Sequence, residues 1–283
     1  MRLGFVVIIA AVLALSMAAA WAYPTLGGAT GIVTLPTADV TPTGSADLAV
    51  DYQQATIDGD ALSSLGFGTG MYVLEGGKGA MASFDGSDVD VKSLPARLTV
   101  GIAEKAEIWG AYDWLDTDVG TANIWSGGAK VLLMTEPADE CSLGIGGSIG
   151  RAEMFDETLD LASAFLVLSK NISAAVSPDA SVTTKLSVGA MWQSLGDPAD
   201  IDSIRPFVGI EFITKESGTF ALEYRFKDDK IDAQAPFSAV WRYPIPDMPA
   251  LTVEIGTTNA AIGGLGLTDQ RIFGGIGYRI TSW

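Results

Sequence analysis

The stretch Leu94-Pro95-Ala96-Arg97-Leu98-Thr99-Val100-Gly101-Ile102 decides the fold of this chain. Its even-numbered positions are all apolar, whereas the polar residues Arg97 and Thr99 share the opposite face. Successive side chains of a β-strand point to opposite faces, so a period of two predicts a strand with one apolar face. The same alternation recurs over residues 182–192 and 220–226. We therefore expect strands, and not helices, to organise the chain.

Twelve segments with this pattern are bounded by clusters of Gly, Pro, Asn and Asp. Each is about ten residues long, which is the span that a tilted strand needs to cross an outer membrane. Strands of soluble sandwiches more often have about five or six residues. The segments cover residues 45–54, 91–102, 106–115, 124–134, 141–151, 159–169, 181–192, 204–213, 218–227, 235–243, 249–257 and 270–281.

The connections between these segments alternate in length. Those after even-numbered segments are mostly tight, as at residues 103–105, whereas those after odd-numbered segments are longer and acidic, as at 55–90 and 228–234. Short periplasmic turns alternating with long external loops are typical of outer-membrane barrels. The predicted fold class is thus all-β: a transmembrane antiparallel up-and-down β-barrel of about 12 strands, located in the bacterial outer membrane.

The N-terminus carries the features of a targeting signal. Met1 and Arg2 supply a positive start, residues 3–15 are almost entirely apolar, and Ala20-Trp21-Ala22 is a small-x-small cleavage pattern. An uncleaved transmembrane anchor is the alternative for the same stretch, and the missing stop-transfer charges disfavour it. We expect three regions: a signal peptide at 1–22, an N-terminal segment leading into the barrel at 23–44, and the barrel at 45–283.

Composition excludes several kinds of chemistry. The 283 residues include 34 Asp and Glu, 17 Lys and Arg, one Cys and no His, for a net charge of −17. Without an imidazole, Ser-His-Asp catalysis and His-ligated zinc are impossible, and one cysteine forms no disulfide within the chain. Acidic loops lack the spacing of a calcium loop with its terminal Glu. We expect a non-enzymatic protein with no catalytic residue, cofactor or metal.

Orienting the apolar faces outward turns charged residues of both signs into the lumen. One interpretation is a paired network that fills a narrow barrel, and the other is the lining of a small aqueous pore. Trp and Tyr residues near strand ends, Trp109 and Trp241 among them, are expected to form aromatic girdles. The candidate lumen-lining residues are Arg97, Lys130, Lys185, Arg205, Glu211, Glu223, Arg225 and Glu254, accompanied on the same faces by Asp47, Asp51, Glu107, Asp113 and Arg242.

Two motifs carry a resemblance to a known family. Residues 31–44 read Gly-Ile-Val-Thr-Leu-Pro-Thr-Ala-Asp-Val-Thr-Pro-Thr-Gly and lead into the first strand, and residues 98–110 form a strand, a tight turn and a returning strand that contains Glu107. Here the chain resembles the YjbH-like family of outer-membrane barrels linked to exopolysaccharide production. The resemblance implies a barrel and a role in surface polysaccharide. Pro36 and Pro42 disfavour a helix and suit an irregular segment packed in the barrel mouth.

Three function classes follow from these observations. The first is a non-enzymatic outer-membrane barrel with an envelope or surface-polysaccharide export role, which the resemblance favours. The second is a small cation-preferring porin, since acidic loops attract cations. The third is a secreted soluble all-β binding protein. The expected partners are outer-membrane lipid and either a polysaccharide or small cations, and no nucleic acid; the sequence leaves the oligomeric state open.

Overall fold

The structure is a computed structural model. It describes residues 25, 28–57, 89–117, 120–136, 140–154, 157–172, 182–196, 199–214, 218–230, 232, 234–260, 266 and 271–281. The expected signal peptide at 1–22 and most of the long connection at 55–90 lie outside the described residues. Within the described part of the chain, no helix is long and apolar enough to cross a membrane.

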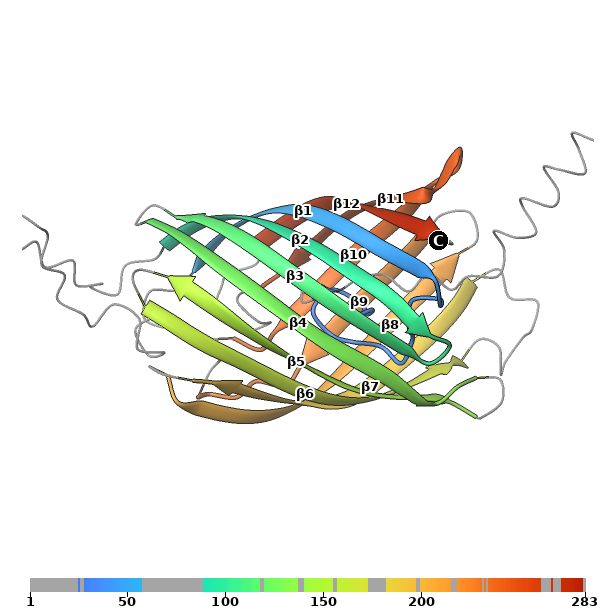
Figure 1. Cartoon of the computed structure of the whole chain (residues 1–283), viewed down its shortest axis with the longest axis horizontal. Helices are drawn as coiled ribbons and strands as arrows, with labels where there is room; N and C mark the ends of the chain where they lie inside the picture. Colours follow the sequence, from blue (N-terminus) through green and yellow to red (C-terminus); the bar gives the residue numbers. More distant parts are fainter. Residues whose placement is uncertain are drawn as a thin grey trace, which may run out of the picture.

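The described residues form a closed antiparallel barrel of twelve strands (Figure 1). Both the fold class and the number of strands predicted from the alternation are confirmed. The strands are β1 (Ser45–Ile57), β2 (Val89–Ala103), β3 (Ala106–Thr117), β4 (Gly120–Met134), β5 (Ser142–Met154), β6 (Glu157–Asn171), β7 (Val182–Leu195), β8 (Ile201–Thr214), β9 (Gly218–Arg225), β10 (Phe237–Ile245), β11 (Met248–Thr258) and β12 (Arg271–Thr281).

The barrel closes because the first and last strands pair. Each strand is hydrogen-bonded to its neighbours in sequence, and β1 pairs with β12 in a register that places Ala46 opposite Ile280. Closure leaves no sheet edge, so the backbone polar groups of the strands are satisfied within the barrel. Several strands are longer than predicted: β2, β4 and β6 each have 15 residues. A ladder of that length continues beyond the roughly 9–11 residues that cross the membrane.

The two faces of the barrel differ as the alternation predicts. In β2, Leu94 and Leu98 are 45% and 44% exposed on the outside, whereas Arg97 and Thr99 are buried inside. Among the described side chains, each of the twelve strands exposes at least one large apolar residue on its outer face, from Leu48 in β1 to Ile280 in β12. An apolar exterior around an interior of polar and charged residues is the architecture of a transmembrane barrel. Such an apolar belt excludes the soluble, secreted alternative.

One aromatic residue departs from the expected girdle. Trp109 is only 7% exposed and lies inside the barrel, 6.4 Å from the ring of Phe165 between centroids. The girdle prediction is therefore wrong for Trp109, whereas Trp125 and Trp241 do face outward. The physical reason is strand parity, because Trp109 follows Glu107 by two residues and therefore shares its inward face.

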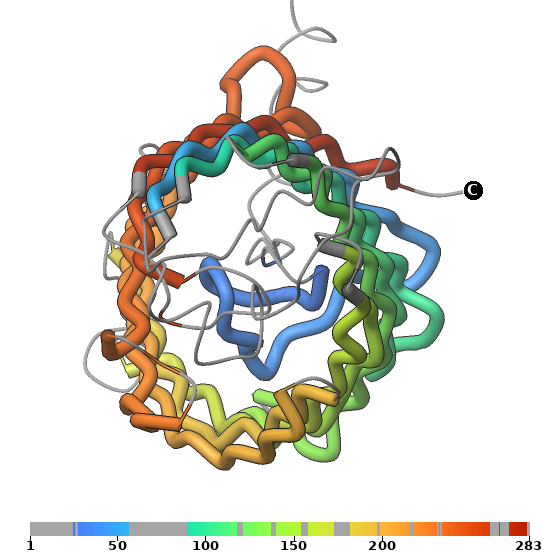
Figure 2. The backbone as a smooth tube through the Cα atoms, turned by 90° about the vertical axis from the view of Figure 1, so that its left-hand side faces the viewer, coloured from blue at the N-terminus to red at the C-terminus, as the bar shows by residue number. Residues whose placement is uncertain are grey.

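The N-terminal segment runs through the interior of the barrel. Residues 28–44, blue in Figure 2, fold across the lumen before they enter β1. We call residues 28–44 the plug. A barrel of roughly eight strands is filled by its own side chains, whereas a barrel of roughly 16–18 strands leaves an aqueous channel. Twelve strands fall between these cases, so space remains in the lumen and the chain's own N-terminal segment fills it.

Two apolar clusters anchor the plug to the wall. The first contains Ala29, Leu35 and Ala38 of the plug, packed against wall residues that include Trp109 and Phe165. The second joins Ile32 and Val33 of the plug to Ala221, Val240 and Phe273 of the wall. The interior of this barrel is thus a small protein core in which the plug supplies one side and the strands supply the other.

Glycines on the wall and in the plug allow this close packing. A Cβ added to Gly209 of β8 would lie 2.1 Å from Cδ1 of Ile32, so only glycine leaves room for that side chain. Gly28 has a φ of +98°, and a Cβ there would lie 2.5 Å from Cδ1 of Trp109. Gly146 of β5 likewise makes room for Phe165, because a Cβ there would lie 2.5 Å from Cζ of that ring.

The face assignment predicts how the barrel responds to a charge on its outer surface. Val188 lies mid-strand on the outside of β7, whereas Ile272 lies at the beginning of β12, also outside. Val188→Arg should lower the free energy of unfolding by about 2–4 kcal/mol, against about 0–1 kcal/mol for Ile272→Arg, because the cost depends on depth in the bilayer. Urea unfolding of the barrel refolded in lipid vesicles measures both. Equal costs at the two positions would contradict the assignment.

Loop parity predicts which end faces the cell exterior. Lys105 is exposed in the turn between β2 and β3, and Asp229 is exposed in the connection between β9 and β10. In a Cys141→Ala background, an impermeant thiol reagent applied to intact cells should label Asp229→Cys and leave Lys105→Cys unlabelled until the cells are lysed. Labelling of Lys105→Cys but not of Asp229→Cys in intact cells would show that the barrel has the opposite orientation in the membrane.

Candidate functional site

The candidate site is the interior of the barrel, where wall side chains hold the plug. All eight candidate residues are buried there, each 7% exposed or less. Three of them contact the plug, Arg97 and Glu254 pair within the wall, Arg205 and Arg225 lie near the end of the barrel opposite the β2–β3 turn, and Glu211 belongs to none of these groups. Their partners are what the sequence did not reveal.

Glu223 of β9 binds a turn of the plug through its backbone. The amides of Val33, Thr34 and Leu35 donate to its carboxylate at 2.9, 2.9 and 3.1 Å, and the hydroxyl of Thr34 donates at 2.6 Å. The turn is closed by a hydrogen bond of 3.0 Å from Ile32 N to Leu35 O. Three consecutive amides thus converge on one carboxylate, as in the backbone nests that bind anions.

Arg242 of β10 binds the carbonyl side of the same turn. Its guanidinium donates to Gly31 O at 3.1 Å and to Ile32 O, and its Nε donates to Glu254 at 3.1 Å. The carbonyls of Gly31 and Ile32 therefore contact a guanidinium, and the amides of residues 33–35 contact a carboxylate. These polar contacts of Glu223 and Arg242 use no plug side chain except the hydroxyl of Thr34.

Glu107 and Lys130 bind two separate parts of the plug. They form a fully buried ion pair at 3.0 Å between β3 and β4. Glu107 accepts the amide of Thr30 at 2.9 Å and that of Thr41 at 2.8 Å, and Lys130 donates to the carbonyls of Thr30 and Thr37 at 2.9 and 3.1 Å. Because residues 30 and 41 lie near the two ends of the plug, this pair fixes both arms of the loop.

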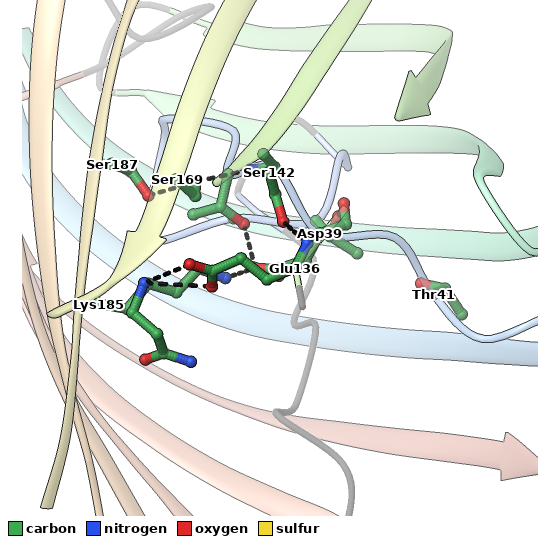
Figure 3. A network of polar contacts seen from close by, with 12 residues as sticks. Asp39, Thr41, Glu136, Ser142, Ser169, Lys185 and Ser187 are labelled. Carbon is green, nitrogen blue, oxygen red and sulfur yellow. Dashed lines mark hydrogen bonds and ion pairs between the residues drawn. The ribbon is translucent and has the colours of Figure 1, made fainter. Parts of the chain in front are cut away.

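Lys185 of β7 makes an ion pair with Asp39 of the plug (Figure 3). Asp39 also accepts the hydroxyl of Thr37 at 2.8 Å. Burial alone would raise the pKa of Asp39, but the charge and hydrogen bond of Lys185, with the hydroxyl of Thr37, hold that pKa below its ordinary value. Asp39 is therefore ionised at neutral pH, and the contact with Lys185 is a pair of full charges.

The remaining candidates, except Glu211, pair within the wall or with a loop. Arg97 contacts Asp51 and lies 3.0 Å from Glu254, which links β1, β2 and β11. Arg205 binds Asp232, in the connection between β9 and β10, through both carboxylate oxygens at 2.6 and 2.5 Å. Arg225 donates to Gln193 at 2.9 Å. Glu211 is buried on β8, and its Oε2 accepts no hydrogen bond from the described residues.

A cavity of about 150 Å³ borders the plug in the half of the barrel away from the β2–β3 turn. Ala29, Thr34 and Pro36 of the plug line one side of it. Its wall includes Ser126, Ser148, Ser163, Phe165, Met191 and Leu195. Hydroxyl groups and apolar side chains therefore line this cavity, on the side of the plug away from the β2–β3 turn.

Strand parity predicts which wall residues face inward, but it does not predict the plug groups that they bind. Asp39, Thr30 and Thr41 belong to an irregular segment in which no period distinguishes one side chain from the next. Arg279, which binds Asp47 at 2.6 Å, also escaped the prediction although it shares the inward phase of β12. Within the described residues, no group of three His, Cys, Asp or Glu side chains could hold a metal ion.

Comparisons with known proteins support the architecture. No protein-family model and no curated protein matches the chain. The COG4313 outer membrane channel from Pseudomonas putida F1 is similar in structure, with a TM-score of 0.52 and 12% identity over 86% of this chain and 97% of that one. The KdgM porin in complex with disordered oligogalacturonate has a TM-score of 0.50 and 9% identity over 82% and 98%. These similarities show the fold alone.

An enzyme is also among the solved structures that match. Outer membrane phospholipase A from Escherichia coli has a TM-score of 0.44 and 8% identity over 84% of this chain and 98% of that one, a likeness too distant to support an argument about activity. The closed twelve-strand barrel, its apolar exterior and its two channel-forming structural neighbours define the class: the chain is an outer-membrane β-barrel.

The Glu223 contact predicts how the plug responds to a single substitution. Glu223→Ala would leave three backbone amides of the turn without their acceptor, and each unsatisfied group costs about 1–3 kcal/mol. Deuterium exchange at residues 33–35 should therefore accelerate by at least tenfold while the barrel strands stay protected. Glu153→Ala, which removes an exposed carboxylate of β5, is the control and should change nothing. Unchanged exchange in Glu223→Ala would contradict the contact.

Proposed function

We propose that this protein is a non-enzymatic outer-membrane barrel that its own N-terminal segment closes at rest, and that it opens to pass a surface polysaccharide. The observation that carries the proposal is the way the plug is held. Four charged wall residues, Glu107, Lys130, Glu223 and Arg242, bind it through backbone groups. Water can replace such hydrogen bonds one by one, so the plug is able to leave without unfolding the wall.

Two observations support a carbohydrate as cargo. The motif over residues 31–44 resembles that of the YjbH-like family, whose members are linked to exopolysaccharide, and this same motif makes up most of the plug. The KdgM porin, which has a similar fold, was found with an oligogalacturonate. The proposal includes a cleaved signal peptide at 1–22, a segment at 23–44 that contains the plug, and a barrel at 45–283 whose eight charged candidates line the path.

The alternative function is a small cation-preferring porin. The fold similarity to a porin favours it, and the net charge of −17 would attract cations to the barrel mouth. The buried ion pairs and the plug argue against steady diffusion, because they occupy the path that an ion would take. A porin function therefore requires that the plug be absent for most of the time.

Conductance distinguishes a closed barrel from an open porin. In planar bilayers the unmodified protein should show negligible conductance, whereas the double variant Glu107→Ala, Glu223→Ala should open frequent channels because both anchors of the plug are gone. Glu153→Ala serves as the control and should remain closed. Steady, cation-selective conductance from the unmodified protein would refute the resting plug and favour the porin. An absence of conductance from the double variant, with the barrel still folded, would refute the proposal that the barrel opens as a channel.

A further inference from the structure

Buried charges of opposite sign face each other in register at four places in the described wall. The pairs are Glu107 with Lys130, Asp47 with Arg279, Arg242 with Glu254, and Lys185 with Glu211. Adjacent residues in register share a face and lie within reach of each other, so each pair is expected to form an ion pair. The first three do so, at 3.0, 2.6 and 3.1 Å. The fourth does not, because Lys185 is paired with Asp39 of the plug instead.

Glu211 is left in an unusual position by this arrangement. It is 7% exposed, its Oε2 accepts no hydrogen bond from the described residues, and its neighbour in register on β9 is the apolar Ala221. Its other charged neighbours are Asp39, Arg242 and Glu223. Arg242 already donates to Glu254 and to the plug, so Lys185 is the cation that remains for Glu211. Two carboxylates, one in the plug and one in the wall, thus compete for one ammonium.

We propose that Lys185 is a two-position latch, which binds Asp39 while the plug is seated and turns to Glu211 when the plug leaves. This inference rests on the proposed function, because it requires that the plug can leave. The lysine side chain suits the role, since its ammonium is a compact charge on a flexible four-carbon stem. Glu211, the register partner of Lys185 on the adjacent strand, is positioned to receive it.

The latch removes an obstacle to opening. A plug that departs with Asp39 takes away the partner of a buried lysine, and an uncompensated buried charge is strongly unfavourable. With Glu211 available, the ammonium exchanges one carboxylate for another, and the open wall keeps a paired interior like that of the other three register pairs. Glu211 therefore favours the open state, and it weakens the closed state by repelling Asp39.

Substitutions at the two carboxylates should have opposite effects on the plug. The reporter is Ala38→Cys in a Cys141→Ala background, because Ala38 is 1% exposed while the plug is seated. The rate at which a small thiol reagent labels this cysteine in the folded full-length protein measures how often the plug leaves. Asp39→Asn should raise the rate about tenfold or more, the effect of losing one charge-assisted hydrogen bond. Glu211→Gln should lower the rate several-fold, because Asp39 then keeps the lysine without competition.

Glu136→Gln is the matched control. Glu136 is another carboxylate whose charge acts on Lys185, but it already accepts the amide of Asn171, so its variant should label at the parent rate. A labelling rate of Glu211→Gln equal to or above that of the parent would overturn the latch. Labelling of Glu136→Gln more slowly than the parent would also overturn it. If Asp39→Asn labels fast while Glu211→Gln matches the parent, the latch fails and the gated barrel stands. A reporter unlabelled in every variant would contradict the latch and the gated channel together.

Discussion

The structure depends on one constraint: a twelve-strand wall encloses more space than its own inward side chains fill, and the charges that it turns inward must find partners there. The plug meets both requirements. Its apolar residues complete two cores inside the barrel, and its backbone amides and carbonyls satisfy Glu107, Lys130, Glu223 and Arg242. Because a buried charge without a partner is so unfavourable, the plug and the wall stabilise each other.

This mutual dependence relates the architecture to a gated path. Polar contacts between plug and wall are numerous, directional and replaceable by water, which is compatible with a segment that both closes the barrel and departs from it. The register of the wall also favours an open state, because charged residues on adjacent strands are able to pair with each other when the plug is absent. Among the four register pairs of the described wall, only that of Lys185 is broken in favour of the plug, so the ion pair between Lys185 and Asp39 is well placed to control opening.

Local periodicity accounts for what the sequence predicted. The alternation around residues 94–102 was enough to derive strands, faces and barrel closure, and parity alone turned all eight candidate charges inward. Trp109 lies near a strand end, where girdle aromatics are expected, but its parity places it inside the barrel. The plug contacts were beyond such reasoning: Val33 and Glu223 are separated by 190 residues, and Thr30 and Glu107 by 77. No local pattern encodes which backbone amide a distant carboxylate will bind, since that choice depends on three-dimensional packing.

A disulfide between plug and wall tests the central claim most directly. The amide of Ala38 lies 2.9 Å from Oγ of Ser169 on β6, and Ser169 in turn lies 2.8 Å from Oγ of Ser187 on β7. In a Cys141→Ala background, the pair Ala38→Cys and Ser169→Cys should cross-link under mild oxidation of the folded barrel, as should the wall pair Ser169→Cys and Ser187→Cys. Cross-linking of the wall pair without any cross-link to position 38 would show that the plug does not occupy the lumen.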